Sequence, residues 1–389
     1  MKIYEVGGCI RDKLLGKTPS DFDYVVVGSS LAEMTSLGFK QVGKNFPVFL
    51  KDGQEYALAR KEIKTGNKHS DFKFIFTPDI TLAEDLERRD FTCNALAYDS
   101  KKDEIIDYHN GISDINNKIL RHVNSEHFPE DPLRVLRMCR FSAQLDFDIA
   151  PETMLLAQNM VKQNMLSHLS SERIWQEIFK ALNTSHFNRF ITSMRQCGAL
   201  KVIMPEVDEI FSFSENTASI LQAINSVTKS SPKVKFATLL LKLNFPEKTA
   251  QLCKRLKVPN DFKDFAKISC QYHGYFYHIL KLPINDLYQT IAALSKYNTD
   301  DLINVFRADY FEGLSEKDPQ IQKDKETFFK KATKIYKSIK ASDMPNFAQL
   351  SKNADFKEKL RDYKIQILQE RLFFPSSHER LPSQSSHER

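Results

Sequence analysis

Residues 20–28 read SDFDYVVVG and predict a β-strand with two acidic side chains at its entrance. Asp21 and Asp23 are two residues apart, and in an extended chain every second side chain points to the same face of a sheet. Two carboxylates on one face repel each other unless a cation lies between them, and carboxylate oxygens are preferred ligands of Mg²⁺. The stretch therefore predicts a divalent-metal site, although an acidic pair alone is also typical of a solvated strand end.

Upstream, the sequence GGCIRD (residues 7–12) follows a first strand-like run and precedes a helical stretch. Glycine lets the backbone amides of Gly7 and Gly8 approach a phosphate at a helix N-terminus, and Arg11 would add positive charge there. Two glycines alone also fit an ordinary turn, because glycine is common wherever φ is positive. Together with the acidic pair at this distance, the motif is typical of a nucleotidyl-transfer site.

A third cluster, RRDFTCNAL (residues 88–96), leads into an apolar segment. The adjacent guanidinium groups of Arg88 and Arg89 can make bidentate hydrogen bonds to triphosphate oxygens, and Asp90 and Asn94 follow them closely. A surface salt bridge is the alternative interpretation of these residues. The cluster indicates a triphosphate site only because the other motifs accompany it.

A fourth cluster, EDPLRVLRMCR (residues 130–140), predicts the start of a helix. We expect Asp131 as the N-cap and Pro132 as the first helical residue, because proline lacks the N–H that this position leaves unbonded. Asp131 and Arg134 would then lie on neighbouring turns of one helix face, with apolar residues packed around them. A basic helix that faces solvent is the alternative.

The acid and the guanidinium of this helix suit two of the four bases. Cytosine and adenine each present an exocyclic amine beside an unprotonated ring nitrogen, so Asp131 can accept from the amine while Arg134 donates to the nitrogen. Uracil and guanine present the inverse pattern. A wrong base leaves buried polar groups unpaired, which gives discrimination on the order of 10⁴ to 10⁵. The sequence thus predicts that protein side chains select C or A.

Patterning divides the chain into a β-rich beginning and a helical remainder. Short β-rich runs separated by Gly and Asp predict a small mixed α/β domain at the N-terminus, and from Asp131 onward apolar residues recur at helical spacing. Prolines limit these helices to ordinary length. The expected segments are a head, a helical neck, a helical body, a helical tail and a polar end, over residues 1–125, 126–185, 186–270, 271–375 and 376–389. The end repeats SSHER, and we expect it to be disordered or a remnant of cloning.

Length and composition fit a multidomain protein of the cytoplasm. The 389 residues are 41% apolar, which is enough for more than one core. No segment reaches the roughly 18 apolar residues of a membrane span, and no signal-peptide pattern follows Met1. The six cysteines are scattered without zinc-finger spacing, as expected for reduced thiols of the cytosol. The net charge of +6 is modest for this length and suits a partner bound by a local basic surface better than a protein that coats nucleic acid, so charge alone leaves an RNA partner open.

The combination of motifs resembles the class II tRNA nucleotidyltransferases, and most closely the bacterial CCA-adding enzymes. The motifs that carry the resemblance are GGCIRD (7–12), DFD (21–23), RRDFTCNA (88–95), EDPLRVLR (130–137) and SERIWQE (171–177). The resemblance implies an α+β fold, in which a polymerase-β-like head with a five-stranded mixed sheet precedes an all-helical neck, body and tail along which tRNA would lie. It also implies addition of C and A to tRNA 3′ ends from CTP and ATP, with Mg²⁺ and without a template.

The resemblance assigns roles to the residues at matching motif positions. Asp21 and Asp23 would bind Mg²⁺ and be the catalytic residues. Asp131 and Arg134 would read the base. The remaining nucleotide-binding residues would be Gly8, Arg11, Arg89, Arg137 and Arg140. The tRNA 3′ hydroxyl would attack the α-phosphate in line, and pyrophosphate would leave.

Two further expectations come from the family. The basic segment KEIKTGNKHSD (residues 61–71) matches a mobile segment thought to help one pocket switch from CTP to ATP, and Gly66 and Asn67 fit a flexible turn. The family's long form also has a phosphohydrolase domain with a His-Asp dipeptide, where this chain has Leu-Leu-Lys at residues 240–242. Leucine cannot ligate a metal, so we expect that activity to be absent.

Other activities fit the same motifs. A bacterial poly(A) polymerase shares the head and the base-reading motif, but usually has a longer N-terminal lead and a basic C-terminal extension. An enzyme that adds only CC or only A is another alternative, as is a noncatalytic RNA-binding protein that kept the fold. The sequence leaves the oligomeric state open between a monomer and a homodimer.

Overall fold

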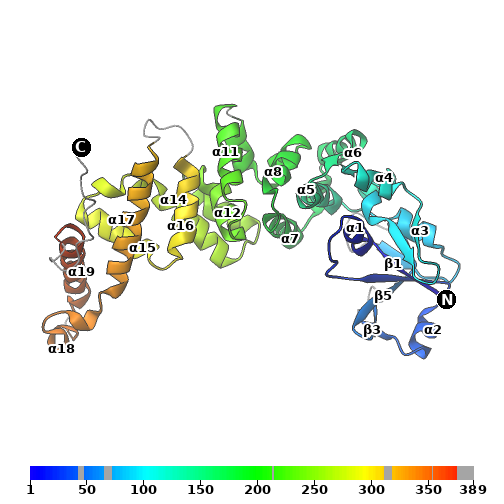
Figure 1. Cartoon of the computed structure of the whole chain (residues 1–389), viewed down its shortest axis with the longest axis horizontal. Helices are drawn as coiled ribbons and strands as arrows, with labels where there is room; N and C mark the ends of the chain where they lie inside the picture. Colours follow the sequence, from blue (N-terminus) through cyan, green and yellow to red (C-terminus); the bar gives the residue numbers. More distant parts are fainter. Residues whose placement is uncertain (43–47, 65–71, 213, 311–317, 353, 375–389) are drawn as a thin grey trace, which may run out of the picture. The chain divides into compact units, whose positions relative to one another are not determined.

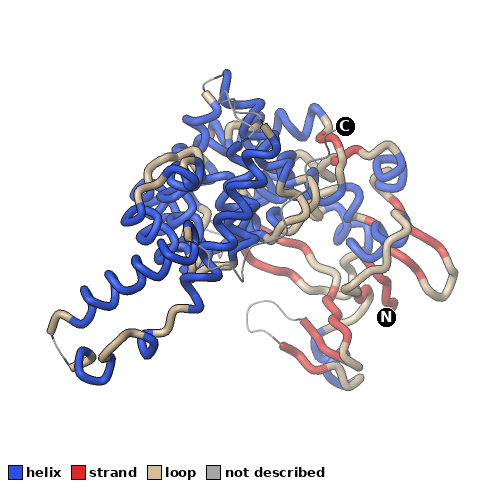
Figure 2. Tube along the Cα trace, turned by 60° about the vertical axis from the view of Figure 1, so that its left-hand side comes forward, coloured by secondary structure: helices blue, strands red, loops and turns tan. Residues whose placement is uncertain are grey.

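The computed structural model describes residues 1–42, 48–64, 72–212, 214–310, 318–352 and 354–374. The chain divides into two compact units, Met1–Asp208 and Glu209–Arg389. In the described ranges, strands occur only in the first unit, and the second consists of helices and their connections (Figure 1, Figure 2). None of the helices in those ranges is both long and apolar enough to cross a membrane. The finer boundaries near 125, 185 and 270 stay predictions, and the SSHER end and residues 65–71 lie outside the described residues.

A seven-stranded mixed sheet forms the centre of the first unit, in the order β3-β4-β5-β2-β1-β8-β9. Its strands are β1 (Lys2–Val6), β2 (Asp23–Val27), β3 (Lys40–Val42), β4 (Val48–Lys51), β5 (Gln54–Leu58), β8 (Leu96–Asp99) and β9 (Glu104–Asp107). Within this sheet β2 and β5 are parallel, and the other neighbouring strands are antiparallel.

The predicted class, an α+β fold with a mixed sheet in the head, is confirmed, but the sheet has seven strands rather than five. The edge strands β3 and β9 are short and contain charged or polar residues, so pairing with a neighbour rather than a strong β pattern makes them strands. Strand β7 (Phe72–Ile75) does not join this sheet but pairs with β6 (Lys61–Lys64) in a separate two-stranded ribbon.

The strand register brings together the chain segments that carry the predicted site. Val6 at the end of β1 lies opposite Asp23 at the start of β2, so the turn after β1 lies beside the entrance of β2. Glu55 of β5 lies opposite Asp23 on the other side. Helix α1 (Gly8–Leu14) begins at this edge, and Gly7 makes the turn with a φ of +82°, a conformation that side chains disfavour.

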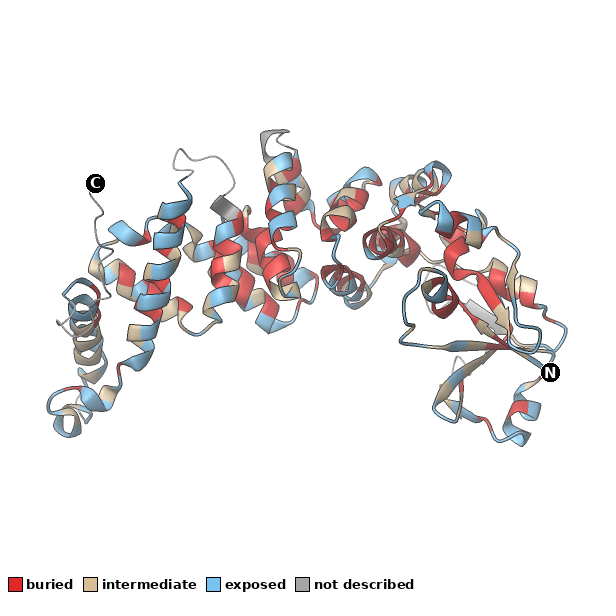
Figure 3. Cartoon of the chain, viewed as in Figure 1, coloured by how far each residue is buried: buried red, intermediate tan, exposed pale blue. Residues whose placement is uncertain are grey.

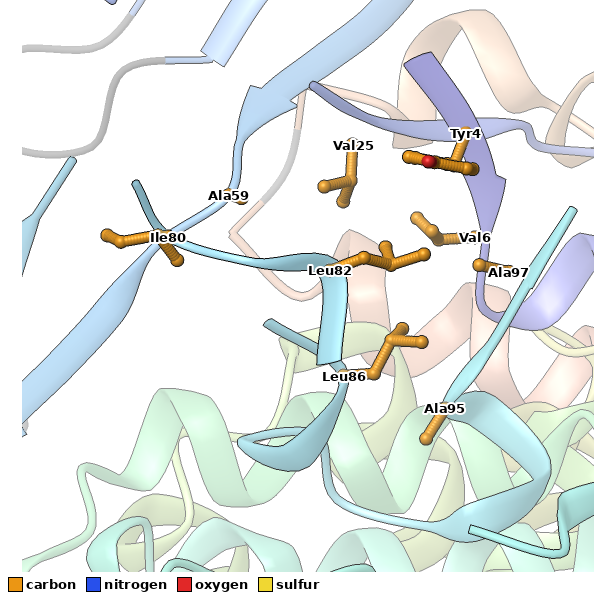
Figure 4. Close-up of a cluster of buried hydrophobic side chains, with 9 residues drawn as sticks. All are labelled: Tyr4, Val6, Val25, Ala59, Ile80, Leu82, Leu86, Ala95 and Ala97. Atoms are coloured by element: carbon orange, nitrogen blue, oxygen red, sulfur yellow. The ribbon is translucent and has the colours of Figure 1, made fainter. Parts of the chain in front are cut away.

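Alternation along β2 directs Val25 to one face of the sheet and Val26 to the other. Helix α3 (Leu82–Glu87) covers the first face, where a buried apolar cluster joins it to the central strands (Figure 4). That cluster consists of Tyr4, Val6, Val25, Ala59, Ile80, Leu82, Leu86, Ala95 and Ala97. Since Asp23 has the same parity as Val25, it points to the face that α3 covers. Large apolar side chains buried in this way contribute about 1.5–3 kcal/mol each, which fixes α3 and the arginines that follow it.

The first unit also contains the helices α2 (Leu31–Ser36), α4 (Gly111–Asn116), α5 (Leu133–Leu145), α6 (Pro151–Lys162), α7 (Ser171–Leu182), α8 (Phe187–Gln196) and α9 (Ala199–Ile203), with 3₁₀ turns η1 (Thr92–Asn94), η2 (Phe128–Glu130) and η3 (Met165–His168). Helix α10 (Pro205–Phe211) begins in the first unit and ends in the second. Helix α5 packs against α7 and α8. It begins one residue later than predicted, with Pro132 rather than Asp131 in the capping position. The Asp131 side chain still caps the helix, because its Oδ1 accepts the N–H of Leu133 at 3.1 Å.

The second unit is built from α11 (Ser214–Ser226), α12 (Pro232–Leu241), α13 (Pro246–Arg255), α14 (Asn260–Tyr277), α15 (Ile284–Leu294), α16 (Thr299–Tyr310), α17 (Pro319–Ser338), α18 (Phe347–Leu350) and α19 (Phe356–Phe373), with 3₁₀ turns η4 (Ile279–Lys281) and η5 (Ala341–Asp343). Helix α12 packs against α14 and α16, and the residues coloured as buried gather on these helices (Figure 3). Leu240 and Leu241 belong to this core. The helical remainder is as predicted, except that β11 (Asp148–Ile149) pairs in parallel with β10 (Ile119–Leu120).

Two glycines provide a test of the packing. A Cβ on Gly111, the first residue of α4, would overlap the carbonyl oxygen of Thr92 in η1. We expect Gly111→Ala to lower the free energy of unfolding by about 1–3 kcal/mol, because backbone atoms must move apart. Gly274→Ala is the matched control, since this exposed position in α14 has nothing within 4 Å of an added Cβ. There alanine should be neutral or stabilising by about 0.5–1 kcal/mol. Chemical denaturation of both variants measures the difference, and equal stabilities would contradict close packing of α4 on η1.

Candidate active site

One cavity in the first unit, of about 1250 Å³, is lined by every residue that the sequence motifs assigned to the site. Those residues are Gly8, Arg11, Asp21, Asp23, Arg89, Asp131, Arg134, Arg137 and Arg140. They belong to α1, to β2 and the segment before it, to the segment after α3, and to α5 and the segment before it, which are far apart in the sequence. The volume exceeds the roughly 300–1000 Å³ usual for a small-molecule site, so a nucleoside triphosphate would leave room for part of a second substrate.

The two carboxylates are exposed at this cavity. Asp23 is the first residue of β2, whereas Asp21 precedes the strand, so the strand begins later than predicted and only Asp23 has its direction set by the sheet. The hydroxyl of Ser20 donates to Asp21 Oδ2 at 3.0 Å. Glu55, which the motif search missed, lines the same cavity from β5. Only the parallel pairing of β5 with β2 reveals this third acid, because its local sequence carries no signal.

The donor set fits Mg²⁺ that is completed by a substrate. Mg²⁺ retains several waters and is usually bound through one or two carboxylates together with substrate phosphates. Asp21 and Asp23 provide such a pair beside a cavity that has room for a triphosphate. In the part of the chain that the structure describes, no three His, Cys, Asp or Glu side chains are grouped to hold a metal by themselves. The site therefore suits a cation that arrives with a nucleotide.

The turn after β1 differs in one respect from the prediction. The N–H of Gly7 donates to the carbonyl oxygen of Leu96 at 3.0 Å, so the expectation that both glycine amides meet a phosphate is wrong for Gly7. Gly7 has another function in the packing, because a Cβ there would lie 2.9 Å from Nη1 of Arg89. Gly8 begins α1 and lines the cavity.

Arg11 is buried beside that turn, with 4% of its surface exposed. Its Nη1 donates to Asn94 Oδ1 at 2.5 Å, and its Nε and Nη2 both donate to Asp12 Oδ1, at 2.9 and 2.8 Å. These bonds hold the guanidinium between α1 and η1. Asn94, which follows the paired arginines in the third motif, is therefore a partner of Arg11 that connects two of the motifs.

At the end of α3, the carboxylate of Asp85 is fully buried beneath two arginines that line the cavity. Arg88 Nη2 lies 2.6 Å from Asp85 Oδ1, and Arg89 Nη2 lies 3.5 Å from Asp85 Oδ2. Burial works to raise the pKa of Asp85, but the charges of Arg88 and Arg89 outweigh it and hold this pKa below its usual value. Burial lowers the pKa of Arg89. The guanidinium groups of Arg88 and Arg89 thus line the cavity, and the carboxylate of Asp85 that compensates their charge is buried on the side away from it.

The two residues expected to read the base are held in place by protein groups. Arg134 donates from Nη1 to the carbonyl oxygen of His127 and from Nη2 to that of Arg88, both at 2.6 Å. Asp131 Oδ2 accepts from Arg173 Nη2 at 2.9 Å. A guanidinium has five N–H donors and a carboxylate about four acceptor positions, so both groups retain capacity for a base. Their orientations are fixed before any ligand binds.

Arg137 and Arg140, on the next turns of α5, are paired with acids from other segments. Arg137 Nε donates to Asp90 Oδ2 at 2.7 Å, and Arg140 Nε donates to Glu177 Oε2 at 2.5 Å. Burial works to raise the pKa of Asp90, but the charges of Arg137 and Arg134 outweigh it and hold this pKa below its usual value. Glu177 lies four residues after Arg173 in SERIWQE, so that motif supplies partners to both ends of the α5 face.

Phe141 lies among these guanidinium groups and lines the cavity. The Cζ atoms of Arg140, Arg137 and Arg11 lie 4.0, 5.3 and 5.5 Å from the centroid of its ring. An aromatic ring attracts cations through its electron-rich face, which favours keeping several positive charges together here. The motif search missed Phe141, because nothing in the sequence distinguishes it from other apolar residues of α5.

Comparison with known proteins places this arrangement in a family. Residues 3–121 match a family model described as the poly A polymerase head domain, and residues 146–211 match one described as the probable RNA and SrmB-binding site of polymerase A. A curated relative, the multifunctional CCA protein of Vibrio vulnificus, is 40% identical, and the match covers 78% of this chain and 83% of the relative. This chain belongs to the family of bacterial CCA-adding enzymes.

Solved structures of CCA-adding enzymes share the fold at low identity. The Thermotoga maritima enzyme complexed with tRNA_CCA is 21% identical, with a TM-score of 0.68 over 95% of this chain and 87% of that one. The Bacillus stearothermophilus enzyme in complex with CTP is 22% identical, with a TM-score of 0.67 over 95% of this chain and 88% of that one. The resemblance inferred from the motifs is therefore confirmed as a family relationship, and the individual roles of the nine cavity residues stay predictions.

Acid should weaken the buried pair of Asp90 and Arg137 in this CCA-adding family member. The folded-state pKa of Asp90 lies below the unfolded value of about 3.9, so its contribution to stability is complete above that value and is lost as pH falls through the folded pKa. Asp90→Asn should cost about 1–3 kcal/mol at pH 7 and should lose less stability than the wild type between pH 5 and 3. Denaturant unfolding at several pH values measures both effects.

Asp148→Asn is the control for this comparison. Asp148 lies 2.6 Å from Arg189, but 89% of its side chain is exposed, so solvent screens the pair and the variant should unfold like the wild type at every pH. Parallel pH profiles for the wild type and Asp90→Asn would contradict a stabilising charge on Asp90.

Proposed function

We propose that this chain builds and repairs the 3′-terminal CCA of tRNA from CTP and ATP, with Mg²⁺ as the cofactor and without a template. The observation that carries the proposal is the single cavity in which an exposed acid pair, a group of arginines and the pair of Asp131 and Arg134 meet. Membership in the CCA-adding family supports the same reaction. The reaction consumes tRNA and free nucleotides, so we place it in the cytoplasm.

In this proposal the tRNA 3′ hydroxyl attacks the α-phosphate in line, and pyrophosphate leaves. Mg²⁺ on Asp21 and Asp23 would supply help in deprotonating the hydroxyl and positive charge for the phosphates. Gly8 and Arg11 at the start of α1 and Arg89 after α3 would hold the triphosphate, with guanidinium groups neutralising charge that grows on the leaving group. These arginines are held by the protein beforehand, so little reorganisation is needed during the reaction.

Asp131 and Arg134 would select the base by accepting from the exocyclic amine of C or A and donating to the adjacent ring nitrogen. Their contacts with Arg173 and with the carbonyl oxygens of His127 and Arg88 support this role, because a discriminating site needs side chains whose geometry is already set. Arg137 and Arg140 would complete the nucleotide site. No base pairing with a template is required for this selection.

A poly(A) polymerase is the alternative with the same chemistry, since the matching model for residues 3–121 carries that name. The curated relative matched over most of this chain is a multifunctional CCA protein, which favours CCA addition. Incubation with tRNA that lacks its terminus, CTP and ATP distinguishes the two reactions. Products that stop after C, C and A support the proposal, whereas long A tails support the polymerase. Omission of CTP or ATP tests for an enzyme that adds only one nucleotide type.

The acid pair is tested by substitution. Asp21→Ala or Asp23→Ala should abolish addition of both C and A, because either change removes half of the proposed cation site. Binding of tRNA in a filter or gel-shift assay should stay near the wild-type level, since backbone phosphate contacts elsewhere would carry affinity. Asp148→Asn, outside this cavity, should retain activity. Substantial activity in either alanine variant would rule out the metal assignment.

Arg134→Ala should relax the choice of nucleotide. Loss of a bidentate base contact costs roughly 1–3 kcal/mol of discrimination, so the ratio of CTP to UTP incorporation should fall by about tenfold or more. The ratio is the informative quantity, because it does not depend on how much of the variant is folded. Arg195→Ala, which changes an arginine outside the cavity, should keep the wild-type ratio. An unchanged ratio in Arg134→Ala would exclude base reading by this residue.

A further inference from the structure

Asp85 is a buried carboxylate that takes no direct part in the chemistry proposed above. It lies in the last turns of α3 with a fully buried side chain, and it is separated from the cavity by the arginines that line it. Burial of a carboxylate is costly unless opposite charge and hydrogen bonds compensate it. The groups that contact the Asp85 carboxylate therefore indicate the role of its charge.

One oxygen of Asp85 is fully engaged in fixing the end of α3. Its Oδ1 accepts from Arg88 Nη2 at 2.6 Å, from Arg88 Nε at 3.2 Å and from the backbone N–H of Arg60 at 3.3 Å. This oxygen joins α3 to the segment that follows β5. The carbonyl oxygen of Arg88 in turn accepts from Arg134, so the same helix end supports the base-reading residue.

The other oxygen of Asp85 forms an ion pair with Arg89. Asp85 Oδ2 makes no hydrogen bond within the described structure, and it lies 3.5 Å from Arg89 Nη2. Arg89 Nε is likewise buried without a hydrogen-bond partner in those residues. The attraction between two charges, rather than a set of directional hydrogen bonds, therefore links Asp85 to Arg89.

Arg89 is confined on its remaining sides. Its Nη1 donates to the carbonyl oxygen of Asn94 at 3.4 Å and packs so closely on Gly7 that a Cβ there would lie 2.9 Å away. Only 18% of the side chain is exposed, at the cavity. Asn94 and Gly7 limit where the guanidinium can go, and Asp85 supplies the force that holds it there.

We propose that Asp85 is a positioning residue for nucleotide binding, which holds Arg89 toward the triphosphate from behind. The inference rests on the proposed function, since it assigns Arg89 to an incoming CTP or ATP. With Asp85 in place, Arg89 presents a fixed charge to the cavity. Without that carboxylate, repulsion from Arg88 moves the Arg89 side chain out of its place, and both nucleotides lose the same contact.

Asp85→Asn separates charge from shape in this arrangement. The asparagine can keep an acceptor at the Oδ1 position for Arg88 and Arg60, but it places an amide donor toward Arg89 and removes the attraction. We expect the KM for CTP and for ATP to rise by about tenfold, with the KM for tRNA unchanged. Calorimetric binding of CTP without tRNA should show the same loss of affinity.

Asp114→Asn is the matched control. Asp114 is also a buried acid of the first unit, bonded to Thr92 at 2.7 Å and to Arg121 at 3.2 Å, but it does not line the cavity. Its substitution should lower the free energy of unfolding and leave the KM for both nucleotides at the wild-type level. This result would separate positioning of Arg89 from general loss of stability.

A double substitution tests whether Asp85 acts through Arg89. If it does, Asp85→Asn combined with Arg89→Ala should have the same nucleotide KM as Arg89→Ala alone. This comparison remains decisive if Asp85→Asn alone does not fold, because the double variant removes both charges. An unchanged nucleotide KM in Asp85→Asn, or a KM in the double variant clearly above that of Arg89→Ala, would overturn the inference. Absence of CCA addition by the wild-type protein would instead contradict the proposed function.

Discussion

Pairing of β1 with β2 is the constraint on which the rest of the site depends. Because Val6 lies opposite Asp23, the turn that leads into α1 and the acidic entrance of β2 are neighbours. The same register brings Glu55 of β5 beside Asp23. A shift of one residue would direct Asp23 to the opposite face, away from α3 and its arginines. Apolar packing of α3 on β1 and β2 maintains this register.

Positive charge in the cavity is held by acids that lie behind it or beside it. Asp85 lies behind Arg88 and Arg89, Asp90 binds Arg137, and Glu177 binds Arg140. Each acid offsets part of the cost of keeping a guanidinium in a partly dry site, and it also limits the positions that the guanidinium can take. A polyanionic ligand in the cavity would neutralise the positive charge that these acids leave uncompensated. Such fixed charges favour transfer of a phosphoryl-type group, because the site does not have to reorganise as charge develops.

Helix α5 connects the proposed base-reading pair with the other arginines of the cavity. Asp131 and Arg134 lie at its start, Arg137 and Arg140 follow on successive turns, and all four line the same cavity. Arg173 and Glu177 of α7 bind to opposite ends of this face, so the two helices form one support. This coupling explains why SERIWQE accompanies EDPLRVLR although none of its three charged residues was assigned to the nucleotide.

Residues whose role depends on their immediate neighbours in the chain could be predicted from the sequence. Gly7 makes a turn that side chains disfavour, and Asp21 and Asp23 mark the entrance of a strand. The arginines of α5 recur at helical spacing. These motifs predicted the class of fold and the residues that line the cavity. Residues that act through contacts between distant segments could not be predicted from the sequence. No local sequence signal marks Glu55, Asp85 or Phe141. The number of strands in the sheet depended on pairing at its edges. The N–H of Gly7 donates to the carbonyl oxygen of Leu96, a contact that the sequence did not predict. Short-range geometry is encoded by neighbouring residues, whereas the partners of a buried charge exist only once packing brings distant segments together.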